Sequence, residues 1–340
     1  METRNSKKIL SFLPKINYGE LGILYALIIL WVAIFITNEN FRKIENYLSI
    51  LREASFVGVA AIGMTLCIIS GAFDLSVGRM LTLLSVITIT IVGKCGLVAT
   101  VIIILILGGI FGIINGLLVA KVRLPAFIAT LAMFYVYQAF AYIYTNGQPI
   151  QFKEKWFTNI GNGNFLGIPV PFIIFIVLAI IGTIILKRTP LGRYILAIGN
   201  SEKASHISGI NIAKVKIIIF SLVGVFTAAA AILISSRLWS ANAGMKQNYE
   251  FDVIAAVVLG GTSLAGGKGS IFNTVISSIF FASLITAMNI FQVESFMQMA
   301  VKGVVLLFAF SLTGIRQIIA DKLRTRKKVK NKSNIKESTI

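Results

Sequence analysis

VIAAVVLGGTSLAGGKGS, residues 253–270, joins a short apolar run to a glycine-rich segment that carries one lysine. A phosphate-binding P-loop requires a glycine, four further residues and then Gly-Lys-Ser/Thr. Counted from Gly261, Lys268 comes one place late and is followed by Gly269 instead of a hydroxyl residue. The spacing therefore argues against nucleotide binding, and the glycines need another explanation.

The composition indicates a membrane protein. Of the 340 residues, 56% are hydrophobic and 13% are charged, and the mean hydropathy is +0.86. Soluble domains carry about 25% charged residues, so we expect an all-α integral membrane protein.

No small-residue cleavage site follows the first apolar run, so we expect no signal peptide. Cys67 and Cys95 have no disulfide or metal-ligand spacing, and His206 lies in a polar loop as a solvated side chain.

The number of membrane crossings depends on the opening stretch. A helix needs roughly 20 apolar residues to cross a bilayer core of about 30 Å, and segment 253–265 is too short to cross as a regular helix. Counted as a glycine-broken crossing, it gives ten crossings and puts both termini on one side. The other candidate runs are 21–37, 54–72, 80–94, 97–120, 126–144, 169–186, 214–236, 271–291 and 297–315.

Lysine and arginine decide the orientation. With ten crossings, 23 of the 32 basic residues fall on the cytoplasmic side, among them Arg79 in the turn between two runs. With nine crossings, the basic residues of the tail would lie outside, against the positive-inside bias. We therefore predict about ten crossings, some of them broken or re-entrant, with both termini cytoplasmic. The chain divides into an N-terminal segment (1–20), a transmembrane domain (21–315) and a basic tail (316–340).

The net charge of +19 also raises the question of nucleic acid. Much of the surplus lies in the tail stretch KLRTRKKVKNKSNIK, residues 322–336. We expect the tail to be a disordered cytoplasmic segment near anionic lipid headgroups, and we expect no nucleic-acid partner.

Two features inside the apolar runs stand out. Gly108, Gly112 and Gly116 recur every four residues, a spacing that lets two helix backbones approach closely. The stretch SGAFDLSVGRM, residues 70–80, contains Asp74, the only acidic residue between Glu53 and Glu154.

An ionisable group among apolar runs usually faces a bundle interior or a watery cavity. The stretch around Asp74 therefore indicates a helix break or re-entrant turn covered by protein or water. Asp74 itself either contacts the substrate directly or caps the next helix by accepting backbone N–H bonds from residues 76–77. Both roles can hold together.

An internal similarity and a half-apolar loop are two further patterns in the sequence. Segments 60–80 and 252–270 look alike, as in transporters built from repeats, although the fold prediction does not depend on this similarity. The loop 187–216 is half apolar, which favours a short helix docked on the membrane surface or on a partner.

Several motifs resemble a known family. SGAFDLSVG, LPAFIATL, TNGQPI, GRYILAIGNSEKASHISGI and VLGGTSLAGGKGSI occur in the same order as in the membrane permeases of bacterial ABC sugar importers, and most resemble the ribose-type group, which also serves galactose, xylose, arabinose and autoinducer-2. The resemblance runs from Phe56 to Gly314. The chain departs from the family pattern at Ala72-Phe73, where Gly-Ile is typical, and before Asn200, where a second glycine is typical.

The resemblance implies a multi-pass permease in the cell (inner) membrane that pairs with a second copy or a paralogue. An extracytoplasmic binding protein would deliver the sugar, and a separate ATPase subunit would hold ATP and Mg, with no cofactor on this chain. The loop 187–212 and the turn 260–270 would transmit ATPase closure. The coupling residues implied are Arg193, Asn200, Glu202, Ser208, Gly209, Gly261, Thr262, Gly266 and Lys268.

We predict a pathway lined by few polar groups, because the binding protein supplies the affinity. Its candidates are Asp74, Ser76, Asn115, Thr130 and Asn289. From their charge, Arg237 and Lys246 are candidates for pairing with acidic residues of the binding protein.

Two other classes of protein fit the sequence less well. An ion-coupled secondary transporter usually needs ionisable residues in the membrane, where Asp74 is nearly alone and Lys302 reads as close to the outer interface. A membrane-anchored enzyme lacks a nucleophile–base or metal-ligand constellation.

Overall fold

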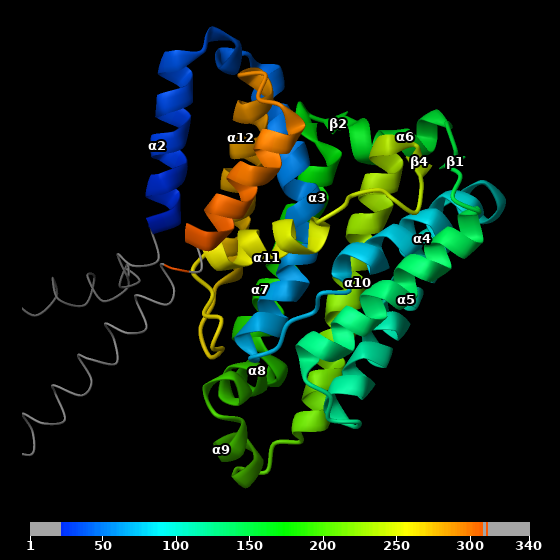
Figure 1. Cartoon of the computed structure of the whole chain (residues 1–340), viewed down its shortest axis with the longest axis vertical. Coiled ribbons are helices and arrows are strands. Elements are labelled where there is room, and N and C mark those ends of the chain that lie inside the picture. Colours follow the sequence, from blue (N-terminus) through cyan, green and yellow to red (C-terminus); the bar gives the residue numbers. More distant parts are fainter. Residues whose placement is uncertain (1–21, 309–310, 312–340) are drawn as a thin grey trace, which may run out of the picture.

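The computed structural model describes residues 22–308 and residue 311, so the predictions for 1–20 and 316–340 lie outside the described residues. The described chain is mostly helical (Figure 1). Its longer helices are α2 (Gly22–Thr37), α3 (Ile44–Ile69), α4 (Val77–Ala120), α5 (Ala126–Thr145), α7 (Val170–Arg188), α10 (Ile212–Leu238), α11 (Tyr249–Leu259) and α12 (Ile271–Ile290). A last described helix covers Ser295–Phe308.

Within the described residues, six helices are long and apolar enough to cross a membrane: α3, α4, α5, α7, α10 and α12. In α3, 83% of the apolar window is buried, against 22% in α5. Helix α3 is therefore central, whereas α5 turns an apolar face outward, as expected of a helix that meets lipid or a partner. Helices α2, α11 and Ser295–Phe308 are apolar but shorter.

Helix α4 is a hairpin of two helices, as the separate runs 80–94 and 97–120 predict. Its 44 residues would extend about 66 Å if straight, twice a bilayer core. Gly96 breaks it with φ 74° and ψ 174°, a conformation open essentially to glycine alone. The chain reverses at this break. Asn115 Nδ2 in the second half donates to Ser76 Oγ at the start of the first half at 2.7 Å, although 39 residues separate them.

The predicted glycine stripe is confirmed as a helix–helix contact. Gly108, Gly112 and Gly116 in the second half of α4 pack on the backbone of α10. A Cβ atom at Gly112 would overlap the carbonyl oxygen of Phe220, and one at Gly116 would meet Cα of Ile217 at 2.7 Å. Only a residue without a side chain lets the two backbones approach this closely.

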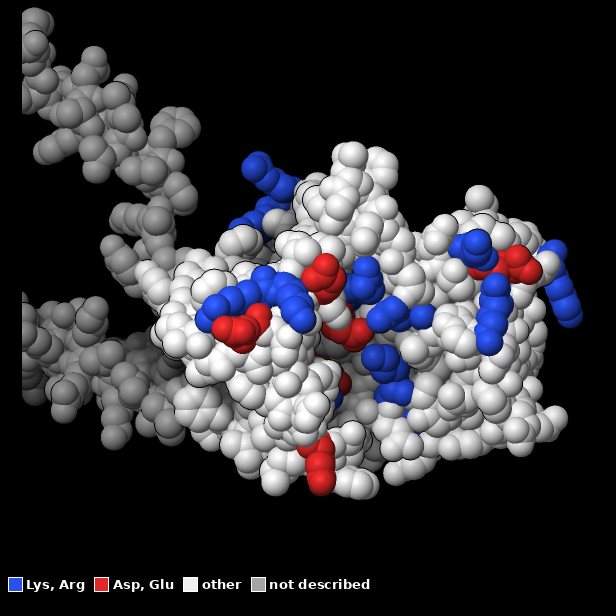
Figure 2. All heavy atoms as spheres, turned by 90° about the horizontal axis from the view of Figure 1, so that it is seen from above, with Lys and Arg blue, Asp and Glu red and all other residues white. Residues whose placement is uncertain are grey.

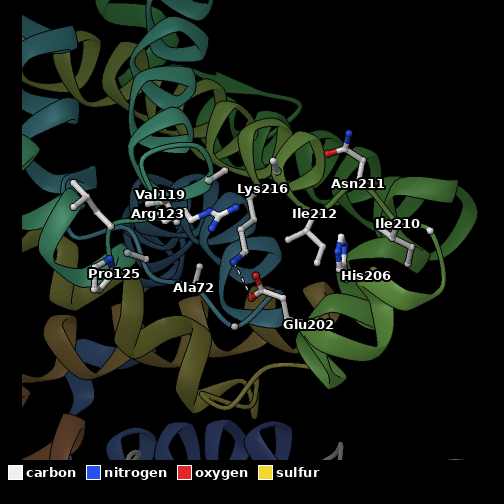
Figure 3. Close-up of a pocket in the computed structure, with 16 residues that line it drawn as sticks. Ala72, Val119, Arg123, Pro125, Glu202, His206, Ile210, Asn211, Ile212 and Lys216 are labelled. Atoms are coloured by element: carbon white, nitrogen blue, oxygen red, sulfur yellow. Dashed lines mark hydrogen bonds and ion pairs between the residues drawn. The ribbon is translucent and has the colours of Figure 1, made fainter.

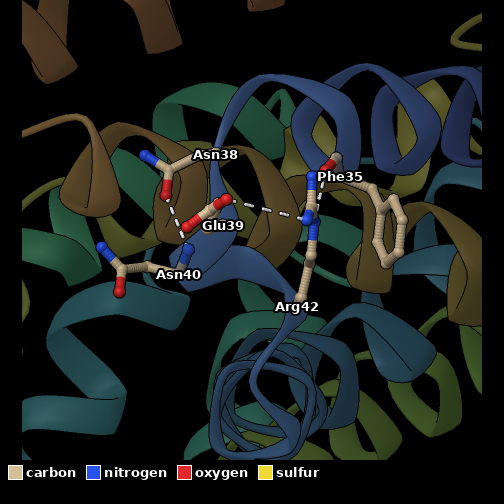
Figure 4. A network of polar contacts seen from close by, with 5 residues as sticks. All are labelled: Phe35, Asn38, Glu39, Asn40 and Arg42. Atoms are coloured by element: carbon tan, nitrogen blue, oxygen red, sulfur yellow. Dashed lines mark hydrogen bonds and ion pairs between the residues drawn. The ribbon is translucent and has the colours of Figure 1, made fainter.

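The corner between α2 and α3 contains the short 3₁₀ helix η2 (Glu39–Arg42), shown in Figure 4. Asn38 Oδ1 accepts the backbone N–H of Asn40 at 2.9 Å and so caps η2. Arg42 Nε donates to the Phe35 carbonyl at 3.2 Å and lies 4.0 Å from Glu39. Helix α3 begins ten residues before the predicted run because Phe41 and Tyr47 pack here in a small hydrophobic cluster.

The two ends of the molecule differ. At the upper end in Figure 1 lie α6 (Lys155–Asn162) and two small antiparallel ribbons. These ribbons pair β1 (Ile150–Gln151) with β4 (Ser240–Ala241), and β2 (Asn164–Phe165) with β3 (Ile168–Pro169). At the lower end, the loop 187–216 forms α8 (Pro190–Asn200) and α9 (Glu202–Ile207), which confirms its predicted helical character.

Candidate translocation and coupling sites

Asp74 lies at the centre of a buried polar network between α3 and α4. Its Oδ1 accepts the Ser76 backbone N–H at 2.9 Å and the Ser76 hydroxyl at 2.6 Å. Its Oδ2 accepts Asn115 Nδ2 at 3.1 Å. Tyr137, which sequence reasoning missed, donates to Asn115 Oδ1 at 3.2 Å. The Ser76 N–H bond is one of those that the capping interpretation predicts, but Ser76 is the N-cap residue of α4 and α4 has no side-chain cap bond, so Asp74 closes the turn just before the helix.

Thr130 joins the same region from α5. Its hydroxyl oxygen accepts the backbone N–H of Leu75 at 3.1 Å. The structure therefore brings together Asp74, Ser76, Asn115 and Thr130, all of them fully buried. Asn289 lies apart from them: it is exposed near the end of α12, where its Oδ1 accepts Gln298 Nε2 at 2.9 Å.

The structure buries further ionisable residues. The sequence predicts Arg79 in the turn between two runs, on the cytoplasmic side. The placement in a turn is wrong, because Arg79 lies in the first turn of α4 and is 7% exposed. Glu250 in α11 is 4% exposed, and Asp252 accepts Lys302 Nζ at 3.1 Å. Asp74 is therefore not nearly alone inside the bundle, and Lys302 is paired. The sequence does not predict this burial, because Arg79 and Glu250 lie at the edges of apolar runs.

The glycines of the opening stretch bring three backbone segments together. The N–H of Gly267 donates to the carbonyl oxygen of Ile69 at 2.8 Å. A Cβ atom at Gly266 would lie 2.9 Å from the carbonyl oxygen of Gly199 and 3.0 Å from the nitrogen of Gly71. The end of α3, the end of α8 and the turn 260–270 thus form one contact, called here the glycine junction. This close approach explains the glycines without a phosphate.

The two helix ends at the junction have the same form. Gly71 follows α3 and Gly261 follows α11, with φ values of 83° and 80°. The next N–H groups, of Ala72 and Thr262, donate to the carbonyl oxygens of Cys67 and Val257, five residues back. This bond, together with a left-handed glycine, marks a Schellman helix end. The two segments that look alike in sequence thus end their helices alike.

The remaining coupling candidates lie around the junction. Asn200 packs against Gly267, while Arg193 and Lys268 are exposed at the same end of the molecule. Ser208 and Gly209 end α9. Thr262 is fully buried and its hydroxyl has no hydrogen-bond partner among the described residues.

A pocket of about 830 Å³ lies beside the junction, between the Gly71–Ala72 turn, the α4–α5 turn and α9 (Figure 3). Lys216 Nζ pairs with Glu202 Oε2 at 2.8 Å on its wall, and Arg123 points toward them. His206 also lines the pocket. These basic groups make the pocket suited to contact with an acidic or phosphate-bearing partner surface.

The upper face carries basic and acidic side chains side by side (Figure 2). Half-buried Arg237 donates through Nη1 to Asn162 Oδ1, and Arg52 Nη2 lies 3.1 Å from Asn164 Oδ1. Both arginines are therefore held by the end of α6 and the segment that follows it. Lys246 lies elsewhere, in the turn before α11 and near Asp252.

No group of three His, Cys, Asp or Glu side chains within the described residues could hold a metal ion.

The chain is similar to known permeases over most of its length. The family model described as branched-chain amino acid transport system / permease component matches residues 46–310. The ribose import permease protein RbsC of Bacillus subtilis is 42% identical, over 86% of this chain and 92% of its own length. RbsC of Escherichia coli K12 is 41% identical, over 86% and 93%. The xylose transport system permease protein XylH of Haemophilus influenzae is 33% identical, over 80% and 90%.

No solved structure matches the chain. The family match and the similar relatives confirm the resemblance that the motifs carry, and the apolar helices agree with it. The chain belongs to the family of multi-pass membrane permeases described as branched-chain amino acid transport system / permease component.

Proposed function

We propose that this chain is the membrane permease subunit of an ABC importer for a monosaccharide, with ribose as the substrate. An extracytoplasmic binding protein delivers the sugar, and a separate ATPase subunit binds ATP and Mg and hydrolyses the ATP. The observation that carries the proposal is the identity of 41–42% with two proteins named ribose import permease, over 86% of the chain. The xylose permease at 33% identity supports the sugar class more broadly.

Ten crossings are proposed for this subunit, with both termini cytoplasmic. They are α2, α3, the two halves of α4, α5, α7, α10, α11, α12 and the helix that begins at Ser295. This topology puts α8, α9 and the turn 260–270 on the cytoplasmic side, which gathers most basic residues there. A second copy or a paralogue completes the pathway, and its face is expected among the apolar surfaces of α4 and α5.

Coupling is proposed to run through the glycine junction. The ATPase docks on α8 and α9, and its closure shifts Gly199 and Asn200 against the turn 260–270. Because Gly267 is bonded to Ile69, the shift reaches α3, α11 and the segment that carries Asp74. Two arrangements of these packed elements, close in energy, would then alternate access.

Asp74, Ser76, Asn115 and Thr130 are proposed to border the pathway near this moving segment, and Asn289 to border it at the outer end. The binding protein docks on the outer side, where Arg237 on the upper face and Lys246 in the turn before α11 pair with its acidic residues. Arg52 joins this surface because it shares Asn162 with Arg237.

Reconstitution tests the proposal. Liposomes that contain this chain with its ATPase should take up radiolabelled ribose only when ATP and the binding protein are both present. The chain alone should neither hydrolyse ATP nor concentrate ribose. Uptake by the chain alone under an ion gradient would show an ion-coupled secondary transporter instead.

A further inference from the structure

An arginine and a glutamate inside the bundle have side-chain atoms without partners. Arg79 is 7% exposed, and its Nε and Nη1 have no hydrogen-bond partner among the described residues. Glu250 is 4% exposed, and its Oε2 has none either. Asp252, on the same helix as Glu250, is by contrast paired with Lys302 at 3.1 Å. Two further buried atoms among the described residues also lack partners, Arg52 Nε and Thr262 Oγ1, and Glu250 carries the one carboxylate oxygen of this set.

Glu250 lies beside the start of α4, which carries Arg79, but the two side chains form no ion pair. Glu250 lies in the first turn of α11 and against Gly78, where a Cβ atom would collide with Oε2. Arg79 lies with Cζ 5.0 Å from the ring centroid of Phe134, which is a cation–π contact. The charge of Arg79 acts on the Glu250 carboxylate, yet the two form no ion pair within 4.0 Å.

Leaving such groups unpaired is costly. A buried donor or acceptor without a partner loses the hydrogen bond that it would make to water, and the loss is larger for a charged group. An ion pair between them would offset part of this cost, and apolar residues would remove it altogether. Ionisable groups kept inside a membrane protein usually mark the path of a solute or ion.

The chemistry of the pair fits a neutral polyol. Arg79 offers N–H donors and Glu250 offers a carboxylate oxygen, and a sugar hydroxyl can accept from the first while it donates to the second. The opposite charges cancel, which suits an uncharged solute better than an ion. We infer that Arg79 and Glu250 form the polar contact for the hydroxyl groups of the transported sugar inside the membrane, an inference that rests on the proposed function.

The pair also lies on elements that meet at the glycine junction. Helix α11 carries Glu250 in its first turn and ends at the turn 260–270, and Arg79 follows the segment that begins at Gly71. A shift at the junction therefore changes the separation of Arg79 and Glu250. The contact can hold the sugar in one state and release it in the other.

The first test compares transport with ATP use in liposomes that contain the permease, its ATPase and the ribose-loaded binding protein. We expect Glu250→Gln and Arg79→Gln to lower the ribose taken up per ATP hydrolysed at least tenfold, while ATP hydrolysis continues. Asp252→Asn is the control: it removes a buried charge on the same helix, and it should lower thermal stability but keep the uptake per ATP. Unchanged uptake in both variants would overturn the inference, as would an equal fall in uptake and hydrolysis.

A second test does not depend on transport by the variant. Glu250→Cys is placed in a chain in which Cys67 and Cys95 are changed to alanine, and a membrane-impermeant thiol reagent is added with ATP and the binding protein. We expect modification at position 250 in at least one nucleotide state, slowed by ribose. No modification in any state would refute the contact. If wild-type uptake requires ATP and the binding protein, these failures leave the proposed function standing.

Discussion

The backbone N–H of Gly267 donates a 2.8 Å hydrogen bond to the carbonyl oxygen of Ile69, which joins the turn after α11 to the last turn of α3. The end of α8 packs on the same two residues through Gly199. A surface segment and two interior helices are therefore in direct backbone contact, so a force on α8 reaches the interior without a long chain of side chains.

Gly199→Ala should disturb this junction. Its Cβ atom would overlap the Ile69 carbonyl oxygen and approach the Gly267 nitrogen, so the backbones must separate. Overpacking of this kind costs about 1–3 kcal/mol, and we expect a lower unfolding temperature and less ribose taken up per ATP. Gly303→Ala is the control, because a Cβ atom there meets nothing within 4 Å. Equal behaviour of the two variants would contradict the role of the junction.

Gly112→Ala should weaken the packing of α4 on α10. The added Cβ atom would overlap the Phe220 carbonyl oxygen, whereas one at Gly109 makes only ordinary contacts at 3.4 and 3.5 Å. We expect Gly112→Ala to lower the thermal unfolding temperature in detergent. Gly109→Ala should leave it unchanged or raise it, because alanine is the better helix former. The glycine stripe would lose its proposed role if Gly109→Ala were the more destabilising change.

Asp74→Asn should impair the buried network, because three donors point at the two carboxylate oxygens. An asparagine has one acceptor oxygen, so its NH₂ group must face Asn115 Nδ2 or the donors of Ser76. We expect a loss of about 1–3 kcal/mol in stability and reduced uptake in vesicles. Unchanged uptake and coupled ATPase activity would remove the functional role of Asp74.

The exchange Asp74→Asn with Asn115→Asp should recover part of that loss. The amide at position 74 can then donate to a carboxylate at position 115, which still accepts from Tyr137. Thermal unfolding of both single variants and the double variant gives the coupling energy between the two sites. A double variant whose loss equals the sum of the single losses would show that the two side chains do not interact.

Docking of the binding protein should depend on charge and on salt. We expect Arg237→Gln and Lys246→Gln to weaken its binding to the reconstituted permease several-fold at low ionic strength, with a smaller difference at high salt, where exposed charges are screened. Lys94→Gln, an exposed charge in the turn at Gly96, is the control. Equal effects of all three changes would show that only the overall charge matters.

The sequence predicted the membrane class, most helices and the breaks near Gly71, Gly96 and Gly260. Those features are local, because apolar length and glycine determine where a helix can cross or end. The early start of α3 was missed, since Ile44–Arg52 is too polar to read as a run and is held by aromatic packing with Phe41 and Trp31.

By itself, the sequence determined that this chain enters a membrane and where most of its helices end. Both depend on local properties, namely the length of each apolar run and the backbone freedom of single glycines. Only the tertiary structure decided that Asn115 meets Asp74, that Gly199 meets Ile69, and that Arg79 and Glu250 are buried near each other. These neighbours lie far apart along the chain, so helix packing and the reversal at Gly96 bring them together.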